Sequence, residues 1–135
     1  MRTFVDTSAL LALLDADQPR HAEAVTAWSS LAAADTPLVT SNYVLLETIT
    51  VAQRRMGLDA VRAFVRDVLP AIETVFVDDE IQQAALGALL AAGRRQLSLV
   101  DCASFEIMRR RRIDRAFAYD AHFDEQGFEL SDRAQ

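Results

Sequence analysis

The chain has 135 residues, of which 51% are hydrophobic, and a formal net charge of −6. This length and composition predict one globular domain over residues 1–135, and the acidic charge argues against a general nucleic-acid coat protein, which would be basic. The start of the chain lacks a signal-peptide pattern, and the longest strongly apolar run (9–14) is too short for a membrane span, so we expect a protein that does not enter a membrane. One cysteine cannot form an internal disulfide, so we expect a cytoplasmic protein.

Short apolar runs alternate with longer helical patterns along the chain. Strands are predicted at Arg2 to Val5, Pro37 to Thr40, Ile72 to Val77, Ala116 to Tyr119 and Phe128 to Leu130. Helices are predicted at Ser8 to Leu14, Pro19 to Ala33, Asn42 to Met56, Asp59 to Leu69, from the cap Asp78 to about Ala92, and Ser98 to Arg111. Strands separated by helices predict an α/β fold, in which helices cover both faces of a parallel sheet.

Four acidic residues stand in apolar stretches far apart in the sequence. Asp6 and Asp120 follow predicted strands, whereas Glu47 and Asp101 lie within predicted helices. A lone carboxylate in apolar surroundings is costly unless it is paired or binds a metal, so four of them suggest one shared site. Ligands of parallel sheets bind beyond the carboxyl ends of strands, where Asp6 and Asp120 are expected. Such hard oxygen ligands suit Mg²⁺ or Mn²⁺.

Three of these acids also have a purely structural interpretation. Asp6 can cap the helix that starts near Ser8, Asp101 can form a capping box with Ser98, and Asp120 can open a turn. Glu47 is harder to explain in this way, because its neighbours at helical spacing (Tyr43, Val44, Thr50 and Val51) form a mostly apolar face.

The segments around the four acids resemble the PIN-domain ribonucleases, in particular the small toxins of VapB–VapC toxin–antitoxin pairs. The matching segments occur in the family order and are Phe4-Val5-Asp6-Thr7-Ser8-Ala9-Leu10-Leu11, Ser41-Asn42-Tyr43-Val44-Leu45-Leu46-Glu47, Leu99-Val100-Asp101-Cys102-Ala103-Ser104-Phe105 and Ala118-Tyr119-Asp120-Ala121-His122-Phe123. The resemblance implies a three-layer fold with a parallel sheet in the order 3-2-1-4-5. It also implies a homodimer, or a heterotetramer or larger assembly with a small antitoxin protein.

The same resemblance implies Mg²⁺-dependent hydrolysis of RNA phosphodiester bonds, with Mn²⁺ as a possible substitute. Asp6, Glu47, Asp101 and Asp120 are the expected catalytic residues. Asp6, Asp101 and Asp120 are expected to hold the metal, and Glu47 to bind it or to orient the attacking water. A bound cation neutralises crowded carboxylates and lowers the pKa of a bound water, so no protein nucleophile is needed.

Further residues are candidates for contacts with the substrate or with the catalytic carboxylates. Thr7 or Ser8 can hydrogen-bond a carboxylate or the scissile phosphate, although either can be an ordinary residue of a helix start. Asp124 stands where some family members have a further acid, and it can equally be a surface residue. Every cation of the chain is an arginine, and Arg112, three turns beyond Asp101 at helical spacing, is the favoured phosphate contact, with Arg54-Arg55 and Arg94-Arg95 as alternatives.

Two other functions compete with the nuclease. An aspartate-based phosphohydrolase would use Asp6 as its nucleophile, but Ser8 stands where that chemistry usually has a second aspartate. A catalytically idle RNA- or protein-binding domain would be expected to have lost one of the four acids. A cysteine hydrolase built on Cys102 is disfavoured because a helical cysteine among apolar residues is usually a core residue, and His122, the histidine nearest the acids, can contact RNA or metal.

Overall fold

A computed structural model describes residues 2–131, and its centre is a five-stranded parallel sheet. The strands are β1 (Thr3–Val5), β2 (Leu38–Ser41), β3 (Ile72–Val75), β4 (Arg115–Phe117) and β5 (Glu129–Leu130). Their order across the sheet is β3-β2-β1-β4-β5, with every neighbouring pair parallel, which confirms the expected order and fold class.

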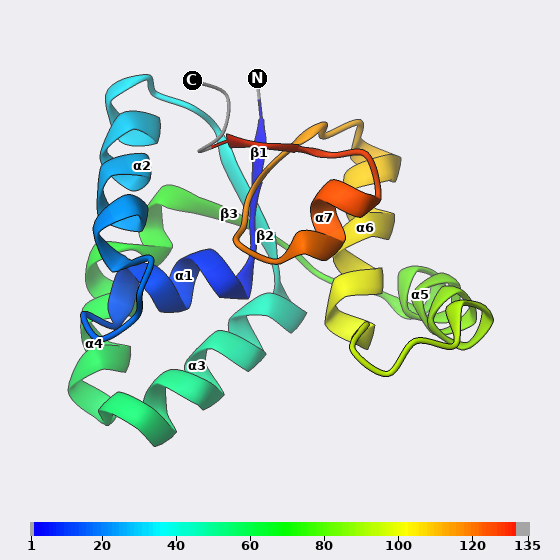
Figure 1. Ribbon diagram of the computed structural model, residues 1–135, viewed down its shortest axis with the longest axis horizontal. Coiled ribbons are helices and arrows are strands. Elements are labelled where there is room, and N and C mark those ends of the chain that lie inside the picture. Colours follow the sequence, from blue (N-terminus) through cyan, green and yellow to red (C-terminus); the bar gives the residue numbers. More distant parts are fainter. Residues whose placement is uncertain (1, 132–135) are drawn as a thin grey trace.

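Helices lie on both sides of this sheet, as the alternation of strands and helices predicts. They are α1 (Thr7–Leu14), α2 (His21–Ala33), α3 (Asn42–Met56), α4 (Leu58–Asp67), the short 3₁₀ helix η1 (Leu69–Ala71), α5 (Asp79–Ala92), α6 (Leu99–Arg111) and α7 (Ala121–Glu125). Figure 1 shows α1, α2 and α4 on one side of the sheet and α5, α6 and α7 on the other. None of the helices in the described part of the chain is long and apolar enough to cross a membrane.

The central strand β1 is completely enclosed by this arrangement. Phe4 and Val5 have no exposed surface, and Phe4 stacks on Phe123 of α7 with 6.5 Å between the ring centroids. Phe123 also meets the edge of Phe105 of α6 at 5.0 Å. These aromatic contacts fix α7 against α6 and β1, and the three elements bring Asp6, Asp101 and Asp120 to the same edge of the sheet.

Several predicted elements end earlier than expected because their last residues bond elsewhere. Strand β3 stops at Val75, since the Val77 amide donates to the Asn42 side chain at 2.7 Å rather than to a strand. Strand β4 stops at Phe117, and the Tyr119 amide donates to the Ser8 hydroxyl at 2.9 Å.

Two helix ends differ from the prediction by more than one residue, and one α-helix is not predicted by the sequence pattern. Helix α4 ends at Asp67, and Pro70 falls in η1. Helix α2 begins at His21, so Pro19 precedes it instead of opening it. Helix α7 was not predicted, because its five residues are too few to show helical periodicity.

Candidate active site

Asp6 lies at the carboxyl end of the central strand and is almost completely buried, with 3% of its surface exposed. Its amide donates to the Phe117 carbonyl of β4, and its side chain caps α1. One carboxylate oxygen, Oδ2, accepts hydrogen bonds from the Ser8 amide at 3.1 Å and the Ser8 hydroxyl at 2.6 Å. The Ser8 hydroxyl also accepts from the Tyr119 amide, so Ser8 ties Asp6 to the segment that carries Asp120.

Asp101 reaches the same edge from the first turn of α6 and is also buried, with 7% exposed. The capping box with Ser98 is present: the Ser98 amide donates to Asp101 Oδ2 at 3.2 Å, and the Asp101 amide donates to the Ser98 hydroxyl at 3.0 Å. The structural interpretation of Asp101 is therefore correct, and it is compatible with a site role because the capped helix start faces Asp120.

Asp120 opens α7, three residues after β4, and is half-buried. Its Oδ1 accepts from the His122 amide at 2.9 Å. The His122 ring lies between two carboxylates, with Nδ1 3.0 Å from Asp120 Oδ1 and 3.3 Å from Asp101 Oδ2. Ligand atoms of Asp101, Asp120 and His122 all lie within 4.8 Å of one another, a spacing at which one metal ion can be held.

The electrostatics of this edge follow from burial and from the close approach of like charges. Burial is the largest influence on Asp6 and raises its pKa from 3.8 to about 7, even though the two hydrogen bonds from Ser8 act to lower it. The charges of Asp101 and Asp120 raise it further. The pKa of Asp101 is also raised, first by burial and then by Asp120. A divalent cation would relieve both the desolvation and the repulsion, so the donor set fits such an ion.

Glu47 stands apart from the three aspartates. It is half-buried on α3 and, like Asp6, lies outside the group of Asp101, Asp120 and His122 whose ligand atoms are within 4.8 Å of one another. Unlike Asp101 and Asp120, it is not among the charges that act on Asp6. It lines an open groove between α3 and the start of α6, whose other lining residues are Tyr43, Leu46, Thr50, Val51, Arg54, Leu99 and Val100. Glu47 therefore faces a surface groove beside the start of the Asp101 helix, rather than the core.

Of the remaining predicted site residues, Ser8 contacts one of the aspartates, whereas Thr7, Asp124 and Arg112 lie elsewhere. Ser8 contacts Asp6, whereas the Thr7 hydroxyl points to the Val44 carbonyl at 3.5 Å. Asp124 is exposed on α7 and is not among the three grouped ligands. Arg112 follows the end of α6 with a left-handed φ of 55°, so helical spacing no longer fixes its direction. Ten residue steps of α6 separate Asp101 from Arg111, so the end of the helix that Arg112 follows lies about 15 Å from Asp101.

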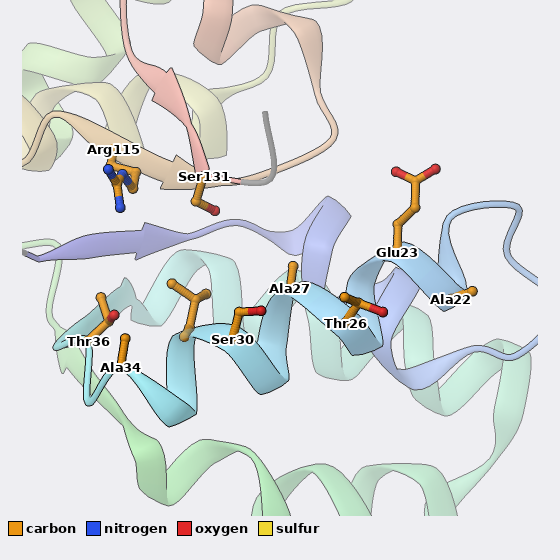
Figure 2. A pocket seen from close by; sticks show the side chains of 10 residues that line it. Ala22, Glu23, Thr26, Ala27, Ser30, Ala34, Thr36, Arg115 and Ser131 are labelled. Atoms are coloured by element: carbon orange, nitrogen blue, oxygen red, sulfur yellow. The ribbon is translucent and has the colours of Figure 1, made fainter. Parts of the chain in front are cut away.

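A second groove lies at the other edge of the sheet. Figure 2 shows it between α2 and the strands β4 and β5, where Arg115 and Ser131 face a row of mostly small residues from α2 and the loop that follows it. Arg115 pairs with Thr3 at the amino ends of β4 and β1, opposite the end that carries the acids. Glu23 is the acidic residue of this lining, so the groove lacks the carboxylate cluster that the other edge has.

A family model matches almost the whole chain. The model of the PIN domain matches residues 3–129. The chain belongs to the PIN-domain family. It is 37% identical over 127 residues to the 23S rRNA-specific endonuclease VapC20 of Mycobacterium tuberculosis, in two strains, covering 93% of this chain and 94% of the relative. The crystal structure of the M. tuberculosis VapC20 toxin, which cleaves the sarcin-ricin loop, matches with a TM-score of 0.82 and 35% identity, over 93% of this chain and 95% of that one.

These matches confirm the PIN family and the interpretation as a toxin-type endoribonuclease. The roles of individual residues and the identity of the metal stay predictions. Sequence reasoning treated His122 as a possible contact for RNA or metal, and the structure places its ring beside Asp101 and Asp120. The position of His122 two residues after Asp120 could have indicated that its side chain lies near the acids. That inference requires helix α7, which the sequence pattern does not predict.

We expect Asp6→Asn to stabilise the metal-free protein at pH 8. Below pH 4 the carboxyl is protonated in both the folded and the unfolded state and contributes no difference. Between pH 4 and 7 the unfolded chain ionises first, so the wild type loses stability as pH rises, and the loss is complete above the folded pKa of about 7. The resulting loss of folding free energy is at most about 4 kcal/mol, because the pKa rises from 3.8 to about 7 and one pKa unit corresponds to 1.36 kcal/mol.

Urea unfolding in chelator between pH 4 and 8 measures this difference. The exposed Asp114→Asn is the matched control and should follow the wild type. Adding Mg²⁺ at pH 8 should stabilise the wild type more than Asp6→Asn, since binding to the folded state adds to its stability. Parallel curves for the wild type and Asp6→Asn at all pH values would contradict the raised pKa.

Proposed function

We propose that this protein is a divalent-cation-dependent endoribonuclease and the toxin of a toxin–antitoxin pair, with Mg²⁺ or Mn²⁺ as the cofactor. The observation that carries the proposal is the convergence of Asp6, Asp101 and Asp120 at the carboxyl edge of the sheet, with Asp6 and Asp101 buried and their pKa values raised. The VapC20 relatives support the reaction class, because they are endonucleases that act on RNA.

The residues of this chain divide the chemistry between them. Asp6, Asp101 and Asp120 would hold the ion, which when bound supplies positive charge and a more acidic water. Ser8 keeps the Asp6 carboxylate in a fixed orientation through two hydrogen bonds to the same oxygen, leaving the other oxygen available. Glu47 lies at the wall of the adjoining groove, where its carboxylate can accept a proton from a water or orient it.

The proposed substrate is the sarcin-ricin loop of large-subunit ribosomal RNA. This proposal rests on the VapC20 relatives, which match the chain over almost its full length. A ribosomal substrate would also place the protein in the cytoplasm, in agreement with the expectation from its single cysteine. Such a loop presents a single defined phosphate to the cation, which suits a protein with a net charge of −6 that attracts RNA weakly overall.

Arg54 is the arginine best placed to contact the RNA backbone. It lines the same groove as Glu47 and forms no ion pair within residues 2–131. Arg94, by contrast, is paired with Glu125 at 2.9 Å. Arg112 lies at the far end of α6 from Asp101, so a contact there would require the RNA to extend along the helix.

Exposed apolar side chains support protein partners. Leu58 and Val65 are exposed on α4, which packs beside α3, and this pair of helices is the proposed binding surface for an amphipathic helix of a small antitoxin. Leu86 and Leu90 lie one turn apart on α5, and Leu90 is 73% exposed. We propose α5 as the homodimer interface, so that the antitoxin complex is a heterotetramer or larger.

The competing functions receive less support. Asp6 is a poor nucleophile for an aspartate-based phosphohydrolase, because only 3% of its surface is exposed and its pKa is raised. The Ser8 hydroxyl also donates a hydrogen bond to its carboxylate. An idle binding domain would not need to keep three carboxylates together against their repulsion.

We expect cleavage of a synthetic sarcin-ricin loop RNA to require a divalent cation. Excess chelator should stop cleavage, and Asp101→Asn should abolish it because it removes a charge that holds the ion. Glu47→Gln should slow it by on the order of 100-fold or more, as is typical when a group that handles a proton is lost. Asp114→Asn should retain the wild-type rate. Undiminished cleavage in chelator would refute the metal mechanism, whereas equal cleavage of an unrelated hairpin would refute only the substrate.

We expect Arg54→Ala to weaken RNA binding and to reduce the slope of log affinity against log salt by about 1, as for one lost phosphate contact. The measurement uses Ca²⁺ in place of Mg²⁺, so that the RNA stays intact. Arg112→Ala is the matched comparison, because the sequence pattern favours Arg112 as the phosphate contact. If Arg112→Ala changes the slope and Arg54→Ala does not, the substrate follows α6 and not the groove.

We expect the purified protein to have twice the mass of one chain by light scattering at tens of micromolar, a concentration above the dissociation constants typical of stable homodimers. Leu90→Glu should yield a monomer, because it places a charge in the proposed α5 interface. Leu58→Glu, on α4, should leave the dimer intact and weaken antitoxin binding. A monodisperse wild-type monomer would contradict the dimer.

A further inference from the structure

One ring nitrogen in the candidate site lacks a hydrogen-bond partner within residues 2–131. Nδ1 of His122 is buried and accepts or donates no hydrogen bond of acceptable geometry. The His122 side chain as a whole is 12% exposed. A buried polar atom without a partner usually indicates a missing water, ion or ligand, since leaving it unsatisfied costs free energy.

The neighbours of this nitrogen are two carboxylate oxygens, which favour positive charge at this position. Asp120 Oδ1 lies 3.0 Å from Nδ1, and Asp101 Oδ2 lies 3.3 Å from it. Asp101, Asp120 and His122 each offer a ligand atom within 4.8 Å of the others, so one positive ion can be shared by two carboxylates and a ring nitrogen.

The position of the ring is fixed by the fold, so the nitrogen does not face the acids by chance. The His122 amide donates to Asp120 at the start of α7. The next residue, Phe123, is fully buried and packs against Phe4 and Phe105. These contacts anchor the first turn of α7 on both sides of the histidine, and they hold Nδ1 toward Asp101.

We propose that His122 is a ligand of the divalent cation through Nδ1, together with Asp101 and Asp120. This proposal rests on the metal site of the proposed function and makes its donor set mixed, with nitrogen as well as oxygen. Imidazole favours transition metals, whereas Mg²⁺ takes oxygen ligands almost exclusively. The site therefore binds Mn²⁺ more tightly than Mg²⁺, and His122 is the source of that preference.

The test uses Mn²⁺ as the probe and needs no RNA. Pulsed electron paramagnetic resonance of the Mn²⁺-loaded full chain should show the modulation of a directly bound ¹⁴N nucleus. His122→Asn places a carboxamide oxygen near the position of Nδ1, so the nitrogen signal should disappear while the carboxylates remain. His21→Asn is the matched control, because His21 is the other histidine of the chain and its Nδ1 is within 2.8 Å of the Ala12 carbonyl.

Calorimetric titration provides the second readout. His122→Asn should lower Mn²⁺ affinity by about tenfold or more, the range seen when groups around a metal are removed, and should change Mg²⁺ affinity much less. Mn²⁺ that binds the wild type without a ¹⁴N signal overturns the role of His122 and leaves the carboxylate site standing. If Mn²⁺ does not bind the wild type at all, both this proposal and the metal site fail.

Discussion

The burial of carboxylates at one edge of the sheet, together with their weaker mutual repulsion, is the constraint to which the rest of the site responds. Three helices begin there, at or next to Asp6, Asp101 and Asp120, and their first turns direct backbone N–H groups and positive dipole ends toward the acids. Each helix end contributes about 0.3–1 kcal/mol. The burial of Asp6 costs more, since its pKa is still raised to about 7. The protein groups alone therefore leave the charge uncompensated, and a cation is the remaining source of compensation.

The capping interactions of these acids also suit the role of metal ligand that we propose for them. Capping fixes each carboxylate through one oxygen: Asp6 uses Oδ2 for Ser8, and Asp101 uses Oδ2 for the Ser98 amide. A carboxylate held in this way loses little conformational entropy when an ion binds. An aspartate at a helix start is thus a preorganised ligand. This explains why the helix-cap interpretation, correct for Asp6 and Asp101, did not argue against the metal site.

The sequence predicted the features that depend on local pattern and missed those that depend on tertiary contacts. Apolar runs separated by helical periodicity predict the parallel sheet. The acids that follow strands predict the edge of the sheet at which the candidate site lies. The direction of Arg112 was not predictable, because the chain leaves α6 in a left-handed conformation. Glu47 is predicted to lie on a mostly apolar helix face, and the structure shows that this face borders a groove. The position of His122 depends on Phe123, which anchors α7 against α6, and α7 is too short to detect from sequence.

The acidic charge of the chain has a consequence for how RNA is selected. Many arginines are engaged by carboxylates: Arg20, Arg62, Arg66, Arg94, Arg110, Arg111 and Arg115 each form an ion pair. These surface pairs add little stability, but they reduce the positive charge available to a phosphate backbone. Sequence-independent attraction, which scales with the number of phosphates neutralised, is therefore weak. Binding must then depend on the few contacts beside the candidate metal site, and an RNA whose fold presents one phosphate to that edge has the advantage over an extended strand.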